Sequence, residues 1–222
     1  MITYPVKLHK KVLFIMSITK DTFQGKIISV QPRIRLTRSF DQRFHNYLGY
    51  SLRIEGKLGE QKNTFLIGIG KAAQAKHSFQ AGDVISGECL PVPDPRLEPV
   101  DFYKVSKLKI IRRTGENQTK EPPWEGVPPT LEEYRRRGHR HLAARTYGTR
   151  CIPCIWGCHM AVEIIVDHWK PNIRKYRYET FCYGPKSCKL YKPGSIRKVQ
   201  GRHGMVWIEE DWVDEDETSH RE

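Results

Sequence analysis

Alternating apolar and polar residues dominate the first half of the chain. In residues 26–38 the alternation puts four aliphatic side chains on one face, Ile28, Val30, Ile34 and Leu36. A period of two is typical of a strand with one buried face. Four further segments repeat the pattern, at residues 47–56, 63–70, 84–91 and 101–112. We therefore expect five strands, with Pro32 marking a bulge or an edge because it lacks a backbone donor.

A short segment of different character separates the third and fourth of these strands. Residues 71–79 contain good helix formers and no strand pattern. Three strands, a helix and two strands is an order that resembles the OB-fold, over residues 24–112. The resemblance implies a five-stranded barrel that binds single-stranded nucleic acid across its second and third strands and the adjoining loops. Cys89 falls inside the fourth strand and is expected in the core.

Cations and aromatic rings gather where the OB-fold resemblance places a ligand. The expected loop between the first two strands, residues 39–46, carries Phe40, Arg43 and Phe44. Arginine neutralises phosphates, and a ring that stacks on a base contributes roughly 1–3 kcal/mol. The candidate contacts in this half are Arg33, Arg35, Arg43, Phe44 and Arg53. The alternative is that Phe40 and Phe44 plug the end of the barrel.

A linker and a basic helix are expected next. Residues 113–129 are rich in proline, glycine and polar side chains. Thr130 and Glu133 have capping-box spacing, which predicts a helix start there, and we expect the helix to reach Arg145. Its candidate phosphate contacts are Arg135, Arg136, Arg137 and Arg140. The alternatives are a solvated linker helix and a helix paired with the acidic C-terminal residues.

Five of the six cysteines lie within residues 150–190. They form a C-x2-C pair, a single cysteine and a C-x5-C pair, namely Cys151 and Cys154, then Cys158, then Cys182 and Cys188. The residues between the pairs alternate like two strands joined by a turn. This order of thiols, strand, turn, strand and thiols resembles a zinc ribbon. The C-x5-C spacing and the fifth cysteine depart from the ribbon pattern.

Zinc bound by Cys151, Cys154, Cys182 and Cys188 is our preferred interpretation, with Cys158 as an alternative ligand. His159 and His168 are weaker candidates. An iron–sulfur cluster also takes four thiolates. Two further alternatives are metal-free cysteines and a redox C-x-x-C followed by a helix.

Net charge narrows the expected partners. The chain of 222 residues carries +13, and its last stretch, residues 209–222, is strongly acidic. The rest of the chain is therefore strongly basic, which favours nucleic acid as the partner. No segment is long enough to cross a membrane, and no export signal is visible, so we expect a reducing compartment. That means the cytoplasm, or the nucleus in a eukaryote.

These patterns predict a mainly β protein with four parts. They are an OB-fold-like domain (1–112), a linker with the basic helix (113–145), a zinc-ribbon-like domain (146–204) and an acidic tail (205–222). The expected function is binding of single-stranded or structured DNA or RNA, with zinc in a structural role. The alternatives are a protein-interaction subunit of a nucleoprotein complex and an enzyme that uses either Cys158 and His159 or a metal-activated water. No phosphate loop, nucleotide fingerprint or paired-carboxylate motif supports the enzyme.

Overall fold

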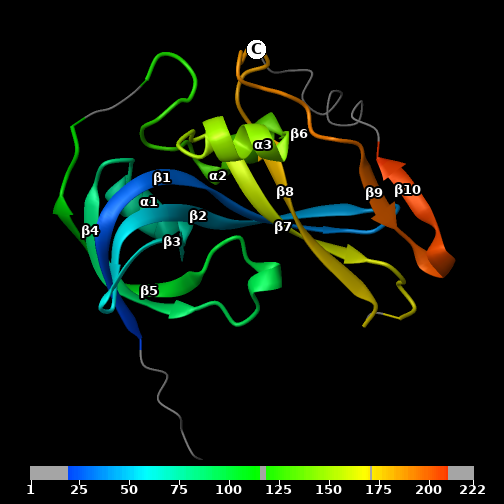
Figure 1. The fold of residues 1–222 in the computed structure, drawn as a ribbon, viewed down its shortest axis with the longest axis horizontal. Helices are drawn as coiled ribbons and strands as arrows, with labels where there is room; N and C mark the ends of the chain where they lie inside the picture. Colours follow the sequence, from blue (N-terminus) through cyan, green and yellow to red (C-terminus); the bar gives the residue numbers. More distant parts are fainter. Residues whose placement is uncertain (1–19, 116–118, 171, 210–222) are drawn as a thin grey trace, which may run out of the picture.

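The computed structural model describes residues 20–115, 119–170 and 172–209, and the fold is mainly β (Figure 1). Its strands are β1 (Asp21–Arg38), β2 (Arg43–Leu58), β3 (Gln61–Ile69), β4 (Val84–Pro91), β5 (Phe102–Arg112), β6 (Arg140–His141), β7 (Gly157–Ile165), β8 (Arg174–Cys182), β9 (Arg197–Gln200) and β10 (Val206–Glu209). Its helices are α1 (Lys71–His77), α2 (Leu131–Arg137) and α3 (Ala144–Thr146), and α3 continues into a π-helical turn over Tyr147–Cys151. The five predicted strands and the helix between them are confirmed.

The first five strands close into a ring. β1 pairs with β2, β2 with β3, and β4 with both β5 and β1, all antiparallel. A parallel contact between Ile67 on β3 and Phe102 on β5 completes the ring. The aliphatic faces of these strands meet inside it, where Ile27, Leu52 and Ile67 are fully buried. Cys89 is also fully buried, as predicted.

The second half of the chain extends the same sheet. Along one edge, β1 pairs with β4 through residues 21–26 and with β7 through residues 35–38, the second pairing being parallel. β8 then pairs with β7, and β6 with β8. Buried residues of both halves form one continuous core, to which β7 and β8 contribute Val162 and Phe181. The domain boundaries at 112, 145 and 204 stay a prediction.

One detail of the β1 pattern is wrong. The register with β2 shifts between Ile27 and Ser29, so Ile27 occupies the core position and Ile28 is only half-buried. A bulge inserts an extra residue and turns the alternation over to the other face. Pro32 lies between the two segments of β1 that pair with β4 and β7, where a missing donor costs no ladder bond.

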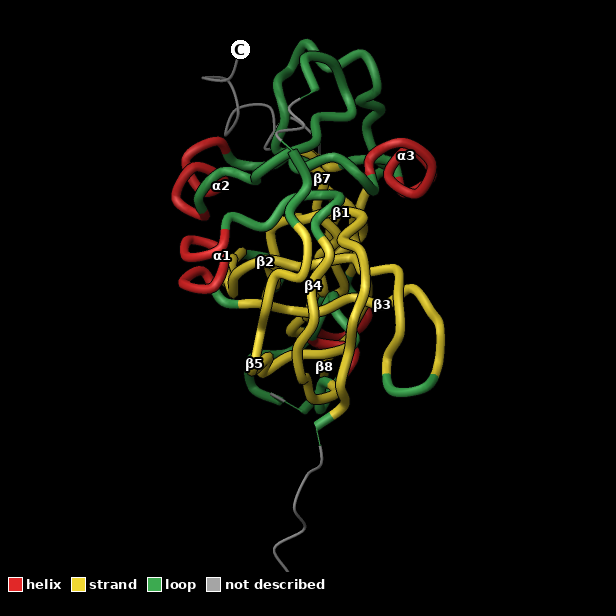
Figure 2. Tube along the Cα trace, turned by 90° about the vertical axis from the view of Figure 1, so that its left-hand side faces the viewer, coloured by secondary structure: helices red, strands yellow, loops and turns green. Residues whose placement is uncertain are grey.

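The basic helix is shorter than predicted. Thr130 caps α2 and its hydroxyl accepts from the Glu133 amide at 3.3 Å, which confirms the predicted start. The helix ends at Arg137 because Gly138 has a φ of 68°. Its Tyr134 is fully buried and donates to the Ile155 carbonyl at 2.6 Å, so α2 packs as part of the core. Figure 2 shows α1 and α2 on one side of the strands and α3 on the other.

The segment predicted as an acidic tail begins with a strand, β10, at Val206–Glu209. The apolar residues 12–18 and the acidic segment beyond Glu209 lie outside the described residues. The helix that a redox C-x-x-C would require after Cys154 is a strand, β7, in this structure.

Candidate functional site

Four cysteines from two turns line a single small cavity. They are Cys151, Cys154, Cys182 and Cys188, the preferred ligand set from the sequence. The first three are 5–8% exposed and pack with Leu142 and Tyr147. The cavity holds about 10 Å³, roughly the room of one water-sized sphere. The β7–β8 hairpin makes this meeting possible because one pair precedes β7 and the other begins at the end of β8.

Backbone hydrogen bonds shape both thiol-bearing turns. The Cys154 amide donates to the Cys151 carbonyl, and the Gly157 amide donates to the Cys154 carbonyl, each at 3.1 Å. In the second turn the Gly184 amide donates to the Cys182 sulfur at 3.4 Å. An N–H that points at sulfur favours the thiolate over the thiol. The two turns therefore line one cavity with four cysteines.

Gln31, on β1, holds the first turn against the ring. Its side-chain nitrogen lies 2.9 Å from the Cys151 carbonyl oxygen, 3.0 Å from that of Ile152 and 2.8 Å from that of Cys154. Its oxygen accepts from the Tyr147 hydroxyl at 2.7 Å. A Cβ at Gly157 would lie 2.8 Å from the Gln31 nitrogen, so the turn has room for glycine only. Sequence reasoning missed this residue, because a polar residue on the outer face of a strand carries no signal of a distant partner.

Burial sets the protonation of the cavity thiols. It raises the pKa of Cys151 to about 12 and that of Cys154 to about 11, and the neighbouring cysteines add to both shifts. Backbone N–H groups of Trp156 and Trp124 act in the opposite direction on the Cys154 pKa. The Cys151 and Cys154 thiols are therefore protonated at neutral pH, and a metal would have to displace those two protons. Within the described part of the chain, no three His, Cys, Asp or Glu side chains already stand in a group that could hold a metal ion.

Cys158 lies apart from this cavity. It is fully buried in the main core, where its thiol donates to the Pro32 carbonyl at 3.4 Å. Burial raises its pKa far above the usual range of a thiol. His159 stacks between Tyr147 and Tyr178, with ring centroids 5.8 Å and 4.7 Å away. The structure thus gives Cys158 neither a place beside the other thiols nor the exposure that a nucleophile needs.

The predicted arginines have mostly protein partners. Arg33 forms an ion pair of 2.8 Å with Glu98, Arg136 pairs with Glu133, and Arg35 is half-buried. The guanidinium groups of Arg135, Arg137 and Arg140 lie over the rings of Tyr47, Trp156 and Tyr191. Arg53 lines a small polar cavity with His159 and Tyr147. The second half of the chain therefore covers the outer face of β1 and β2, where the sequence predicted nucleic-acid contacts.

A different surface carries exposed rings and cations, at the far ends of three strand pairs. It comprises the β1–β2 loop (residues 39–42), the β7–β8 turn (residues 166–170), the β9–β10 turn (residues 201–205) and the strand residues beside them, and we call it the loop end. Phe40 stacks on Trp207 at 5.1 Å, and His168 lies 3.6 Å from Asp41, so β10 and the β7–β8 turn both lie beside the β1–β2 loop.

The loop end exposes aromatic side chains between cations. Phe44 is 65% exposed and Trp169 83%, so the alternative in which Phe40 and Phe44 plug the ring is wrong. Its exposed cations are Lys170, Arg174, Lys175, Lys198 and Arg202, and Arg43 begins β2 beside them. Of the predicted contacts, only Arg43 and Phe44 lie here. Sequence reasoning missed Trp169 and Trp207 as candidate binding residues. Their positions could have indicated them, because Trp169 lies in a turn and Trp207 lies on the last strand.

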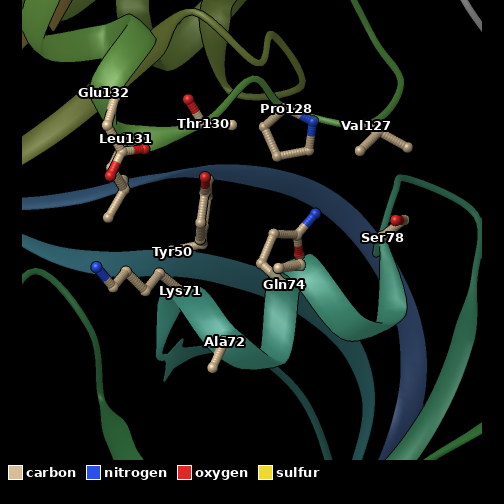
Figure 3. A pocket seen from close by; sticks show the side chains of 11 residues that line it. Tyr50, Lys71, Ala72, Gln74, Ser78, Val127, Pro128, Thr130, Leu131 and Glu132 are labelled. Atoms are coloured by element: carbon tan, nitrogen blue, oxygen red, sulfur yellow. The ribbon is translucent and has the colours of Figure 1, made fainter.

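An apolar groove lies elsewhere, between α1 and the segment that leads into α2 (Figure 3). It has a volume of about 430 Å³. Tyr50 lines it and donates to the Pro129 carbonyl at 2.8 Å, which ties the linker to the ring. None of the predicted site residues lines this groove.

Comparisons with protein-family models, with curated proteins and with solved structures gave no match for this chain. Within the described residues no helix has the length and apolar character needed to cross a membrane.

Proposed function

We propose that this protein binds single-stranded nucleic acid at the loop end and that one zinc ion, held by Cys151, Cys154, Cys182 and Cys188, stabilises its fold. The observation that carries the binding proposal is the group of exposed rings set among cations. Rings stack on bases of any sequence, and the cations neutralise the phosphates between them. A surface of this composition favours a flexible strand over a duplex, whose bases are already stacked.

The OB-fold and zinc-ribbon interpretations belong to this proposal. The ring order β1-β2-β3-β5-β4, with α1 between β3 and β4, supports an OB-fold. The β7–β8 hairpin, with a thiol pair at each open end, supports a ribbon-like module. OB-folds commonly bind their ligand across strands 2 and 3. Because the second half covers the outer face of β1 and β2, we place the ligand at the loop end, which includes the loop between them.

We propose a single zinc ion for the cysteine cavity. Four sulfur donors match a closed tetrahedral site, which is structural in proteins. The space of about 10 Å³ suits one ion better than a cluster of several iron and sulfide atoms. Zinc would fasten the turn before β7 to the turn after β8, and its binding energy would add to folding.

Binding of fluorescent oligonucleotides at several salt concentrations tests the nucleic-acid proposal. We expect the full-length chain to bind single-stranded DNA or RNA, and to bind a duplex of the same length more weakly. Three or four phosphate contacts predict a slope of about −2 to −3 for log K against log salt. Equal affinity for the duplex, or no binding at low salt, would refute the proposal. The latter result would favour the protein-interaction alternative.

Metal analysis of two variants tests the zinc proposal. We expect one zinc per wild-type chain and its loss in Cys182→Ser, while Cys158→Ala, away from the cavity, retains it. A wild-type chain without metal, or equal loss from both variants, would contradict the assignment. Iron with visible absorbance would identify a cluster instead.

A further inference from the structure

The apolar groove between α1 and the segment that leads into α2 has the size of a ligand site. Its volume of about 430 Å³ lies within the range of about 300–1,000 Å³ that small-molecule pockets occupy. Two of its lining residues, Tyr50 and Leu131, are buried in the main core, and the Tyr50 hydroxyl donates to the Pro129 carbonyl at 2.8 Å. The fold therefore holds this side of the groove in place before any ligand arrives.

Two opposite charges stand at one end of this groove. Lys71 begins α1 and Glu132 lies in the first turn of α2, and both residues are exposed. Figure 3 shows these two side chains at the same end of the groove, while Val127 lies at the other. Hydrogen bonds from its own backbone and from Thr130 lower the Glu132 pKa, and the positive charge of Lys71 lowers it further. Lys71 therefore lies close enough to act on that carboxylate.

The remainder of the groove is mostly apolar. Val127 and Pro128 line it from the linker, and Ala72 and Ala75 line it from α1. Val127 and both alanines are exposed to solvent, so a ligand can reach them. Covering these side chains removes apolar surface from water, which favours a ligand with an apolar body. A ligand that matches the whole groove therefore has an apolar body and, at one end, both a positive and a negative group.

We propose that this groove binds a free α-amino acid with a large apolar side chain, such as phenylalanine or leucine. The α-carboxylate of the ligand lies near Lys71 and its α-ammonium near Glu132, where each charge gains an oppositely charged hydrogen-bond partner. The ligand side chain covers Val127, Pro128 and Ala75. A fatty acid would bring its carboxylate to Glu132 as well as to Lys71, and a simple amine would bring its charge to Lys71, so a zwitterion suits this end better. Binding here is separate from the nucleic-acid function proposed above.

Isothermal titration calorimetry of the full-length chain with L-phenylalanine and three relatives tests the site. At pH 6, where the ligand amines are protonated, we expect phenylalanine to bind with a Kd between about 10 μM and about 1 mM. Alanine, which lacks the apolar body, should not bind measurably. N-acetyl-phenylalanine has no ammonium and phenylalanine amide has no carboxylate, so each should bind about 3- to 10-fold more weakly than phenylalanine. No binding of either phenylalanine or leucine, or equal binding of phenylalanine and its two derivatives, would overturn the proposal.

Two charge variants assign the two ends of the zwitterion. Lys71→Met should weaken phenylalanine binding about 3- to 10-fold but should not weaken binding of phenylalanine amide, which has no carboxylate. Glu132→Gln should weaken phenylalanine binding by a similar factor but should not weaken binding of N-acetyl-phenylalanine, which has no ammonium. Lys76→Met, on an exposed position of α1 outside the groove lining, is the matched control and should change neither affinity. A charge variant that weakens phenylalanine and its derivative equally, or weakens neither, would contradict the assignment of that charge.

A bulky side chain placed in the groove tests the location. Ala75→Trp, at an exposed position of α1, fills part of the groove with an indole and should abolish phenylalanine binding, and Ala72→Trp is a second blocking variant. Ala144→Trp, at an exposed position of α3, is the matched control and should leave binding unchanged. Circular dichroism melts establish that each variant is folded before it is scored. Phenylalanine binding retained in the folded blocking variants would show that the ligand lies elsewhere and would refute this site.

Discussion

Replacing Gln31 by leucine should damage the link between the five-strand ring and the cysteine turn. The side-chain nitrogen has two protons for three carbonyl oxygens at 2.8–3.0 Å, so it satisfies two bonds fully at any moment. A third bond comes from the Tyr147 hydroxyl. At about 1–1.5 kcal/mol each, the three contribute about 3–4 kcal/mol, a large share of a typical total of about 5–15 kcal/mol. Leucine has nearly the same size and can make none of them.

Urea unfolding of the metal-loaded chain measures this loss. Gln31→Leu should lower the free energy of unfolding by about 3–4 kcal/mol, whereas Gln61→Leu, at an exposed position on β3, should change it by less than about 0.5 kcal/mol. Tyr147→Phe alone should cost about 1 kcal/mol, and the double variant should cost less than the sum, because the two side chains share a bond. If Gln31→Leu matches Gln61→Leu, the reasoning is wrong.

The charge of residue 31 gives a second result from the same site. In Gln31→Glu a carboxylate would face carbonyl oxygens, so burial should favour its protonated form and raise its folded pKa above the ordinary value of about 4.3. The stability that this side chain contributes to the fold is then complete below pH 4.3 and is lost as pH rises through the folded pKa. Gln31→Glu should therefore lose stability relative to Gln31→Leu between about pH 4 and 7. Parallel pH profiles of the two variants would contradict this interpretation.

Three shorter predictions test other parts of the fold. Thr130→Ala removes the α2 cap and should cost about 1 kcal/mol, or a fall of about 2–4 °C in Tm by calorimetry. Glu98→Gln leaves the mostly buried Arg33 without its carboxylate and should lower the free energy of unfolding by about 2–3 kcal/mol, measured with urea. Glu133→Gln breaks an exposed ion pair and should lower it by less than about 1 kcal/mol. Burial raises the Cys89 pKa from 9.0 to about 12, so the stability it contributes is complete below pH 9 and is lost as pH rises toward 12. Cys89→Ala should therefore lose less stability than the wild-type chain as pH rises from about 9 to about 11.

Most of the five-strand ring could be predicted from the sequence alone. Period-two alternation located all five strands, and capping spacing located the start of α2. The core face of β1 was misassigned at Ile28, because a bulge changes the phase of the alternation and leaves no mark in a single sequence. The extent of α2 was overestimated because the predicted helix ran to Arg145, through Gly138, whose left-handed backbone ends the helix in the structure.

Long-range contacts explain what the sequence could not show about the site. Cysteine spacing indicated which four thiols share a cavity, since a hairpin brings its two open ends together. Nothing local indicated that β7 would pair with β1, or that Gln31 would be buried against the cysteine turn on a face whose sequence pattern predicts solvent exposure. For the same reason the predicted contact at Arg53 lies in a small cavity lined by residues of the second half, whereas Arg33 is paired with Glu98 of the β4–β5 loop. The loop end depends on three turns far apart in the sequence, and only their meeting makes it a surface.

The most direct test of the central claim is the affinity of single-stranded DNA for the full-length chain with and without the exposed rings of the loop end. One base stacked on each ring at about 1–3 kcal/mol predicts that Phe44→Ala and Trp169→Ala each weaken binding by about 5- to 150-fold. Ile111→Ala, which removes a half-exposed apolar side chain on β5, should leave the affinity unchanged. Unchanged affinity in both ring variants, with wild-type binding intact, would contradict the assignment of the loop end as the nucleic-acid surface.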